Sequence, residues 1–197
     1  MKTRIDHAGP YPVEQVTYHP ASALVDLDAP RAGVLHTTEG GWAGSESVLL
    51  HRHFAPHFML GLDKGKIHIV QFVPIGHIGT ACRAHNNKAI VQIEMIGFAK
   101  EELWRPDEET SKALAALMVV CRDEWGIPLS RPWKDGDYGR AGDNPHRHAG
   151  KFGEVAGWYG HADMLQPDAH WDPGNLEWSY IFGLANNTAP IGALPEA

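Results

Sequence analysis

The residues best suited to chemistry lie in one stretch near the C-terminal end of the chain, GWYGHADMLQPDAHWDPGNLEW, at positions 157–178. His161 and Asp172 stand eleven positions apart in it, and His170 lies two residues before Asp172. Imidazole and carboxylate groups are good ligands for first-row metals, and a catalytic zinc takes three protein ligands and keeps one position open. The stretch therefore offers two ligands of such a site, and the third must come from elsewhere in the chain.

The best candidate for the third ligand is His36, which follows an apolar run far upstream. The run AGVLHTT, at positions 32–38, predicts a short buried strand that ends on this histidine. A ligand at a strand end is held by the sheet and still faces a cleft. The alternative is that His36 is an ordinary buried histidine and Asp172 caps a turn, because the chain has 13 histidines and the spacing matches no short zinc signature.

Five features occur together and in order between about residues 31 and 185. They are GVLHTTEGGW, HFMLGLDKGKIHIVQFV, GHIGT, a pair of asparagines before AIVQIEMIGF, and GHAD…HWDPG. In these features the chain resembles the zinc-dependent N-acetylmuramoyl-L-alanine amidases of the type-2 group, which includes phage lysozymes of this chemistry and peptidoglycan recognition proteins. The resemblance implies a Zn²⁺ cofactor, peptidoglycan as the partner, and hydrolysis of the amide between N-acetylmuramic acid and L-alanine.

The resemblance also implies roles for individual residues. His36, His161 and Asp172 match the three zinc ligands of the family, although some relatives carry cysteine at the aspartate position. Glu94 in IVQIEMIG matches the glutamate of the family's IGIEL strand, which serves acid/base chemistry in some members. Other members use a tyrosine at the position of Pro56, which cannot do this chemistry, so the role falls to Glu94. The alternative for Glu94 is a solvent-facing strand position.

Further residues of the site are expected from the same resemblance. His170 stands where several relatives carry a lysine that stabilises the oxyanion, and a histidine can donate the same hydrogen bond. The alternative is a surface histidine in a turn. Thr37, Thr38, His77 and Asn87 occupy places where the family contacts substrate.

Other histidines and the tryptophans carry weaker expectations. His51, His53 and His57 are expected in the cleft wall or at the surface rather than in a second metal site. His146 and His148 lie in a long loop and have no obvious third partner for a metal. Four tryptophans could line a sugar- or peptide-binding groove or lie in the core, namely Trp42, Trp133, Trp158 and Trp171.

The element pattern predicts a single α/β domain in which a central mixed β-sheet is flanked by helices and carries a zinc cleft on one face. We expect an irregular N-terminal arm over 1–30 packed on the domain, the catalytic domain over 31–185, and a loose tail over 186–197. Within the domain, the expected elements are a helix from Ser45 to about His53, a hairpin of 57–62 and 67–73, a strand over 89–96, a long helix from Pro106 to Trp125, and a final helix after Gly174.

The net charge and the distribution of apolar residues argue against two classes of partner, nucleic acids and membranes. A formal net charge of −7 argues against nucleic acid as a partner, because nucleic-acid binding needs clustered Lys and Arg. No apolar run approaches the roughly 20 residues of a membrane helix, and no signal peptide is visible. We therefore expect a monomer that does not insert into membranes, is made in the (host) cytoplasm and acts on the bacterial cell wall after release.

The two cysteines are too few for a disulfide framework. Cys121 is expected on the buried face of the long helix, whereas Cys82 could be exposed, and a bridge between them is the less favoured alternative. For the function, a phage endolysin and a bacterial amidase both fit. The rivals are a peptidoglycan-binding module without catalysis and a zinc hydrolase of another amide.

Overall fold

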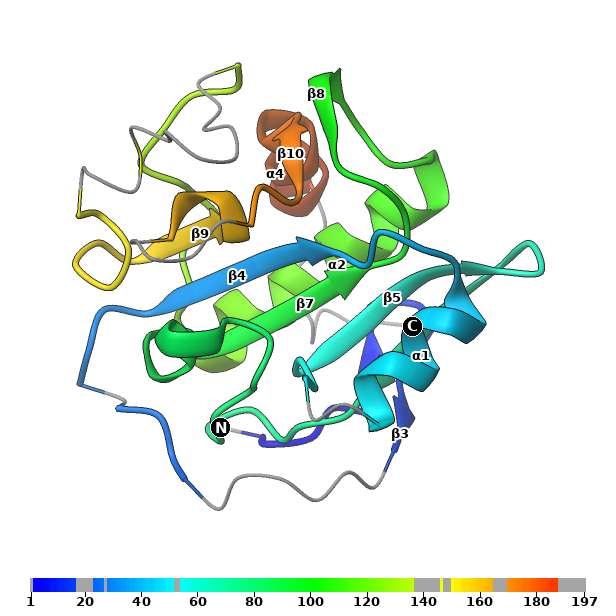
Figure 1. Ribbon diagram of the computed structural model, residues 1–197, viewed down its shortest axis with the longest axis horizontal. Coiled ribbons are helices and arrows are strands. Elements are labelled where there is room, and N and C mark those ends of the chain that lie inside the picture. Colours follow the sequence, from blue (N-terminus) through cyan, green and yellow to red (C-terminus); the bar gives the residue numbers. More distant parts are fainter. Residues whose placement is uncertain are drawn as a thin grey trace, which may run out of the picture.

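A six-stranded mixed β-sheet forms the centre of the computed structural model, as predicted (Figure 1). The structure describes residues 2–16, 23–26, 28–51, 54–136, 146, 150–164 and 170–187. In chain order the strands of this sheet are β3 (Glu14–Gln15), β4 (Ala32–Thr37), β5 (Phe58–Asp63), β6 (Lys66–Gln71), β7 (Val91–Met95) and β9 (Gly157–Gly160). They lie in the order β3-β6-β5-β7-β4-β9. Strands β4, β5, β7 and β9 are parallel, and β6 is antiparallel to its hairpin partner β5.

One face of the sheet is covered by α2 (Glu108–Trp125), seen behind the sheet in Figure 1, and α4 (Trp178–Asn187) packs against α2. Helix α2 starts where Asp107 accepts a hydrogen bond from the Thr110 backbone nitrogen at 2.9 Å, and it ends at Gly126, whose φ of 70° suits a residue without a side chain. Leu114, Leu117 and their neighbours pack against the sheet. Burying each such side chain contributes roughly 1.5–3 kcal/mol, which makes this layer the main core.

The other face of the sheet carries α1 (Trp42–His51), which packs through Leu49 onto Met59 and Val70. The helix begins three residues earlier than the predicted start at Ser45. The Ser45 hydroxyl donates to the carbonyl of Gly41 at 2.8 Å, so it bonds back into the first turn instead of capping it. The predicted end at His53 lies outside the described residues.

Side-chain alternation along β4 and β7 separates the core from the site. Leu35 and Ile93 belong to the cluster under α2, while the neighbouring His36 and Glu94 point to the opposite face. His36 and Glu94 are also register partners, so they lie side by side across the two strands. The sheet thus holds both side chains at one place on the face away from α2.

Several short elements were not expected from the sequence. Residues 1–30, expected to be irregular, include β1 (His7–Ala8), β2 (Tyr11–Pro12) and β3, which pairs with β6 at the edge of the sheet. Near the C-terminus, β10 (Gly174–Leu176) pairs in parallel with β8 (Lys100–Trp104), so the final helix starts at Trp178 and not directly after the turn. A side-chain carbon at Gly174 would collide with the backbone of Lys100, which explains the glycine there.

Both cysteines are buried, and neither is in a disulfide. Cys121 lies on the core side of α2 as expected. The expectation that Cys82 could be exposed is wrong, because its side chain packs in a separate cluster with Val34 and Tyr159. Among the described helices, none is both long enough and apolar enough to cross a membrane.

Candidate metal centre and catalytic cleft

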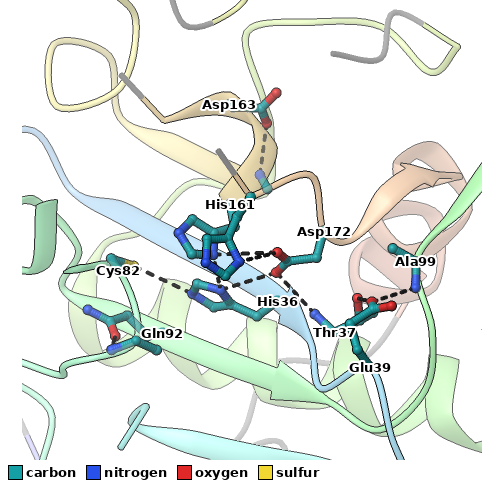
Figure 2. Close-up of polar contacts among 12 residues, drawn as sticks. His36, Thr37, Glu39, Cys82, Gln92, Ala99, His161, Asp163 and Asp172 are labelled. Carbon is teal, nitrogen blue, oxygen red and sulfur yellow. Dashed lines mark hydrogen bonds and ion pairs between the residues drawn. The ribbon is translucent and has the colours of Figure 1, made fainter. Parts of the chain in front are cut away.

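His36, His161 and Asp172 meet at the ends of β4 and β9, although they are far apart in the sequence (Figure 2). The two histidines face each other through their Nδ1 atoms, which lie 3.0 Å apart. Asp172 Oδ2 lies 3.3 Å from the His36 Nδ1 atom, and Oδ1 lies 3.5 Å from the His161 Nδ1 atom. All three side chains are buried, so these atoms form a small triangle below the protein surface.

The parallel pairing of β4 with β9 brings the two histidines together. Leu35 is the register partner of Gly160, and the residues that follow them are His36 and His161. His161 begins a short 3-10 helix, η2 (His161–Asp163), that leaves the sheet at this point. Asp172 is brought to the pair because its backbone oxygen accepts a hydrogen bond from Ala162 at 2.9 Å.

A buried polar network holds the η2 turn. One carboxylate oxygen of Asp163 accepts hydrogen bonds from the Gly160 backbone nitrogen at 2.8 Å and from Arg131 at 3.1 Å, and its other oxygen contacts the His146 Nδ1 atom at 2.7 Å. Trp133 stacks on the His146 ring at 4.0 Å between centroids. His146, for which the sequence suggested no third partner for a metal, therefore supports the segment that carries His161. His148 lies outside the described residues.

The triangle suits a divalent metal in both geometry and charge. Ligand atoms around a tetrahedral zinc, each about 2.0–2.2 Å from it, lie roughly 3.3–3.6 Å from one another. One ligand atom from each of the three residues lies within 4.8 Å of the other two. The two Nδ1 atoms are 3.0 Å apart, and each of them has a different Asp172 oxygen at 3.3 or 3.5 Å. Burial, with the neighbouring His161, lowers the pKa of His36 to about 4, so its ring is neutral. Burial alone would raise the pKa of Asp172, but hydrogen bonds from the surrounding histidines, His161 first, keep it well below 3.8. Both groups are thus in the protonation state that metal binding requires.

A cleft of about 570 Å³ opens over this triangle. It is lined by His36, Thr37, Thr38, Glu39, Gly40, Gly41, Gly44, Ser45, Val48, Leu49, Phe54, Ala81, Arg83, Glu94, His161, His170 and Asp172. The apolar side chains come from α1, from Ala81 and from Phe54, which is 47% exposed. A chain bound in the cleft would therefore lie between an apolar wall and the polar triangle.

Glu94 lines this cleft from β7. Its Oε2 atom is buried and has no hydrogen-bond partner within the described part of the chain. Burial raises the pKa of Glu94 to about 8, Asp172 adds to the rise, and His161 opposes it. A carboxyl group with a pKa near the working pH can both take and return a proton, as a general acid/base must.

The other expected site residues divide into two groups. His170 lines the cleft, its ring is stacked on that of His161 at 4.3 Å, and its Nδ1 atom lies 3.4 Å from Asp172 Oδ1. Thr37 and Thr38 also line the cleft. His77 and Asn87 are not among the cleft-lining residues.

The contacts of the loop before β7 explain why His77 and Asn87 lie elsewhere. The His77 carbonyl accepts a hydrogen bond from the ring of His57 at 2.9 Å, which places this part of the loop over the core. Asn87 is exposed, and its neighbour Asn86 is the one that turns inward and accepts from the Cys82 backbone nitrogen at 2.7 Å. His57 is fully buried, so the expectation that it lies at the cleft wall or surface is wrong.

None of the tryptophans lines the cleft within the described residues. Trp158 is fully buried in the main core, Trp42 contacts the ring of His68, and Trp133 packs on His146. For these three tryptophans, the alternative of packing inside the protein therefore fits better than a sugar- or peptide-binding groove.

Sequence reasoning missed two charged residues of the cleft, Glu39 and Arg83. Both have a left-handed backbone, with φ of 52° and 47°, which is uncommon for residues with a side chain and often occurs at functional sites. The Glu39 carboxylate is held by the Thr37 hydroxyl at 2.7 Å and by the Ala99 backbone nitrogen at 2.8 Å. Arg83 is the one Lys or Arg side chain among the lining residues that the structure describes. A positive φ at these positions leaves no recognisable pattern in one sequence.

In this domain, a mixed sheet flanked by helices holds a buried group of two histidines and an aspartate that could bind a metal ion at a cleft. Residues 26–175 match the family model described as N-acetylmuramoyl-L-alanine amidase, and the chain belongs to this family. The match spans every candidate ligand and confirms the family suggested by the sequence motifs. No curated protein matches the chain significantly.

Solved structures of amidases and endolysins share the fold. The N-acetylmuramoyl-L-alanine amidase LysC from Clostridium intestinale URNW is 18% identical, with 88% of this chain and 97% of that chain covered and a TM-score of 0.56. For the Staphylococcus aureus hydrolase AmiA, solved with its ligand, the identity is 17%, the coverage 88% and 81%, and the TM-score 0.60. The Ph2119 endolysin from Thermus scotoductus MAT2119 bacteriophage Ph2119 is 15% identical, with 88% of this chain and 98% of that chain covered and a TM-score of 0.54. These likenesses confirm the predicted fold class.

Proposed function

We propose that this protein is a zinc-dependent N-acetylmuramoyl-L-alanine amidase that cleaves the amide between the lactyl group of N-acetylmuramic acid and L-alanine in peptidoglycan. The observation that carries the proposal is the triangle of His36, His161 and Asp172 opening into a cleft beside Glu94. These three residues would hold the ion. Zinc in this position would polarise the scissile carbonyl and activate a water molecule.

The side chains around the triangle would carry out the proton transfers. Glu94 would accept the proton of the attacking water as the new carbon–oxygen bond forms, and would then give it to the leaving nitrogen as the carbon–nitrogen bond breaks. His170 would donate a hydrogen bond to the oxyanion of the tetrahedral intermediate, a kind of contact worth roughly 3–4 kcal/mol in other enzymes. The products are a lactyl carboxylate on the sugar and a free amine on L-alanine.

Substrate contacts are proposed for Thr37 and Thr38, which flank the triangle in the cleft. His77 and Asn87 remain weaker candidates, because neither is among the residues that line it. The finer biological role that we propose is that of a phage endolysin, supported by the similarity in fold to an endolysin of a Thermus phage. Clearing of purified cell walls would test this role separately from the bond that is cleaved.

The test is to incubate the purified protein with peptidoglycan and identify the new ends by mass spectrometry, with and without a zinc chelator. New L-alanine amines that form only without chelator, and return when zinc is added back, are the expected result. Soluble products with other new ends would favour a zinc hydrolase of another amide. Binding to peptidoglycan without any new ends would favour a binding module and would contradict the proposal.

Replacement of His170 by alanine should lower kcat about a hundredfold to a thousandfold, because the oxyanion loses a hydrogen-bond donor. Lysine keeps a donor and a positive charge at this position, so His170→Lys should stay active. The exposed His51 on α1 provides a matched control, since His51→Ala and His51→Lys should leave kcat unchanged. Wild-type kcat in His170→Ala, or loss of activity in His170→Lys, would contradict the role of His170.

A further inference from the structure

The ring of His36 is held from both sides. Its Nδ1 atom faces the proposed metal position, and its Nε2 atom lies 3.5 Å from the sulfur of Cys82 (Figure 2). Cys82 is fully buried beside Val34 and Tyr159. A sulfur atom therefore occupies the place behind the ligand where metal-binding histidines usually have a carboxylate, a backbone carbonyl or a water.

This contact matters because a neutral imidazole carries one proton and can place it on either nitrogen. If the proton is on Nε2, that nitrogen donates to the sulfur and the lone pair of Nδ1 points to the metal position. If the proton is on Nδ1, the ring cannot bind a metal there. Without a metal, the Asp172 carboxylate 3.3 Å from Nδ1 competes for this proton. With a metal on Nδ1, the proton is on Nε2, so a sulfur acceptor there stabilises the metal-bound form of His36 and fixes the orientation of its ring.

The position of Cys82 is itself fixed by the sheet. Its backbone nitrogen donates to the Asn86 side chain at 2.7 Å, and the preceding residue, Ala81, donates to the buried side chain of Gln92 at 2.8 Å. Gln92 shares β7 with Glu94 and is two residues away from it, on the same face. The loop that presents the sulfur is therefore tied to the strand that presents the proposed general base.

We propose that Cys82 is a positioning residue for the metal centre, and that its sulfur accepts a hydrogen bond from His36 Nε2 and so orients the ring and its tautomer for zinc. The inference rests on the proposed zinc site, but it concerns binding of the ion and not turnover. It gives a role to a cysteine that is neither a ligand in the triangle nor part of a disulfide.

The experiment measures the zinc dissociation constant of the folded protein by competition with a chromophoric chelator. Cys82→Val fills the same space without an acceptor and should weaken zinc binding about tenfold to a hundredfold. Cys82→Ser keeps an acceptor and should stay within about threefold of the wild type, while the visible spectrum of the cobalt-substituted protein should change in Cys82→Val and less in Cys82→Ser. Cys121, the other buried cysteine, lies in α2 and supplies matched controls, since Cys121→Val and Cys121→Ser should leave zinc affinity unchanged.

A folded Cys82→Val variant with wild-type zinc affinity would overturn the inference, as would a wild-type chain that binds no zinc. If Cys82→Val does not fold, the smaller Cys82→Ala variant replaces it, since it also removes the acceptor. A folded Cys82→Ala variant with wild-type zinc affinity would overturn the inference. Tight zinc binding without release of L-alanine amines would contradict the proposed amidase activity and leave the role of Cys82 standing.

Discussion

Replacement of His36 by alanine is expected to remove both the bound zinc and the hydrolytic activity. His36 supplies one of three candidate ligands, with its Nδ1 atom 3.0 Å from His161 Nδ1 and 3.3 Å from Asp172 Oδ2, and two remaining ligands would leave too few contacts for tight binding. The wild-type protein should hold close to one zinc per chain, and the variant should hold almost none at micromolar zinc. Amide cleavage should fall by about a thousandfold or more, because the metal activates both water and carbonyl.

Asp172→Asn tests how much the negative charge of the aspartate contributes to zinc binding at the same centre. The amide keeps the size of the carboxylate but removes the negative charge that the surrounding histidines stabilise. We expect zinc affinity to fall nearly as far as in His36→Ala. The exposed His51, which bonds the Ser47 carbonyl on α1, is the control for a histidine outside the centre, and His51→Ala should bind zinc and cleave normally. Full activity in a zinc-free His36→Ala protein would rule out the proposed mechanism.

His36 and Glu94 could be placed from the sequence because their positions on strands follow from local rules. An apolar run predicts a buried strand, so a histidine at its end is held next to a cleft, as His36 is. Alternation along β7 likewise separated Ile93 in the core from Glu94 on the other face. The family motifs then joined these positions to the distant segment that contains His161 and Asp172, which no local rule could do.

The parts that could not be predicted depend on tertiary neighbours. Histidine is a common residue type at functional sites, but His57 lies in the core. Its two ring nitrogens are bonded to the backbone carbonyl of His77 and the backbone nitrogen of Gln92, and burial lowers its pKa to about 4. The role that we propose for Cys82 gave no signal in the sequence, because it depends on the ring of His36, 46 positions away. Glu39 and Arg83 reach the cleft through backbone angles that few residues adopt, and a single sequence does not mark them.

Replacement of Glu94 by glutamine should leave zinc binding intact and lower kcat by about a hundredfold to ten-thousandfold, the usual contribution of a general acid/base. Glutamine keeps the size and part of the polarity of the side chain but cannot exchange a proton. Because the pKa of Glu94 is raised by burial to about 8, the wild-type enzyme should lose activity as the pH falls and the carboxylate takes up a proton. A bound divalent cation lowers that pKa, so the acid limb should lie between about 4.5 and 8.

Gln92→Glu is not a suitable control for this substitution, because Gln92 is fully buried and a new charge there would disturb the fold. Glu101 lies on the exposed strand β8, and Glu101→Gln should leave kcat, its pH profile and the zinc content unchanged. If Glu94→Gln kept the wild-type kcat, or lost its zinc, Glu94 would not be the proton-transfer group.

In the metal-free protein, Glu94→Gln should also change how the free energy of unfolding depends on pH. The burial of Glu94 determines the direction of this change. A carboxyl group whose folded-state pKa is raised favours the fold fully below pH 4.5, and this contribution is lost as the pH rises toward about 8. In the presence of chelator, wild-type stability should therefore fall between these pH values relative to Glu94→Gln, by no more than roughly 5 kcal/mol at about 1.36 kcal/mol per pH unit. Urea unfolding at pH 5 and pH 9 measures the difference. If the free energies of unfolding of the two proteins changed with pH in parallel, Glu94 would ionise in the metal-free fold as readily as in the unfolded chain. That result would contradict its raised pKa.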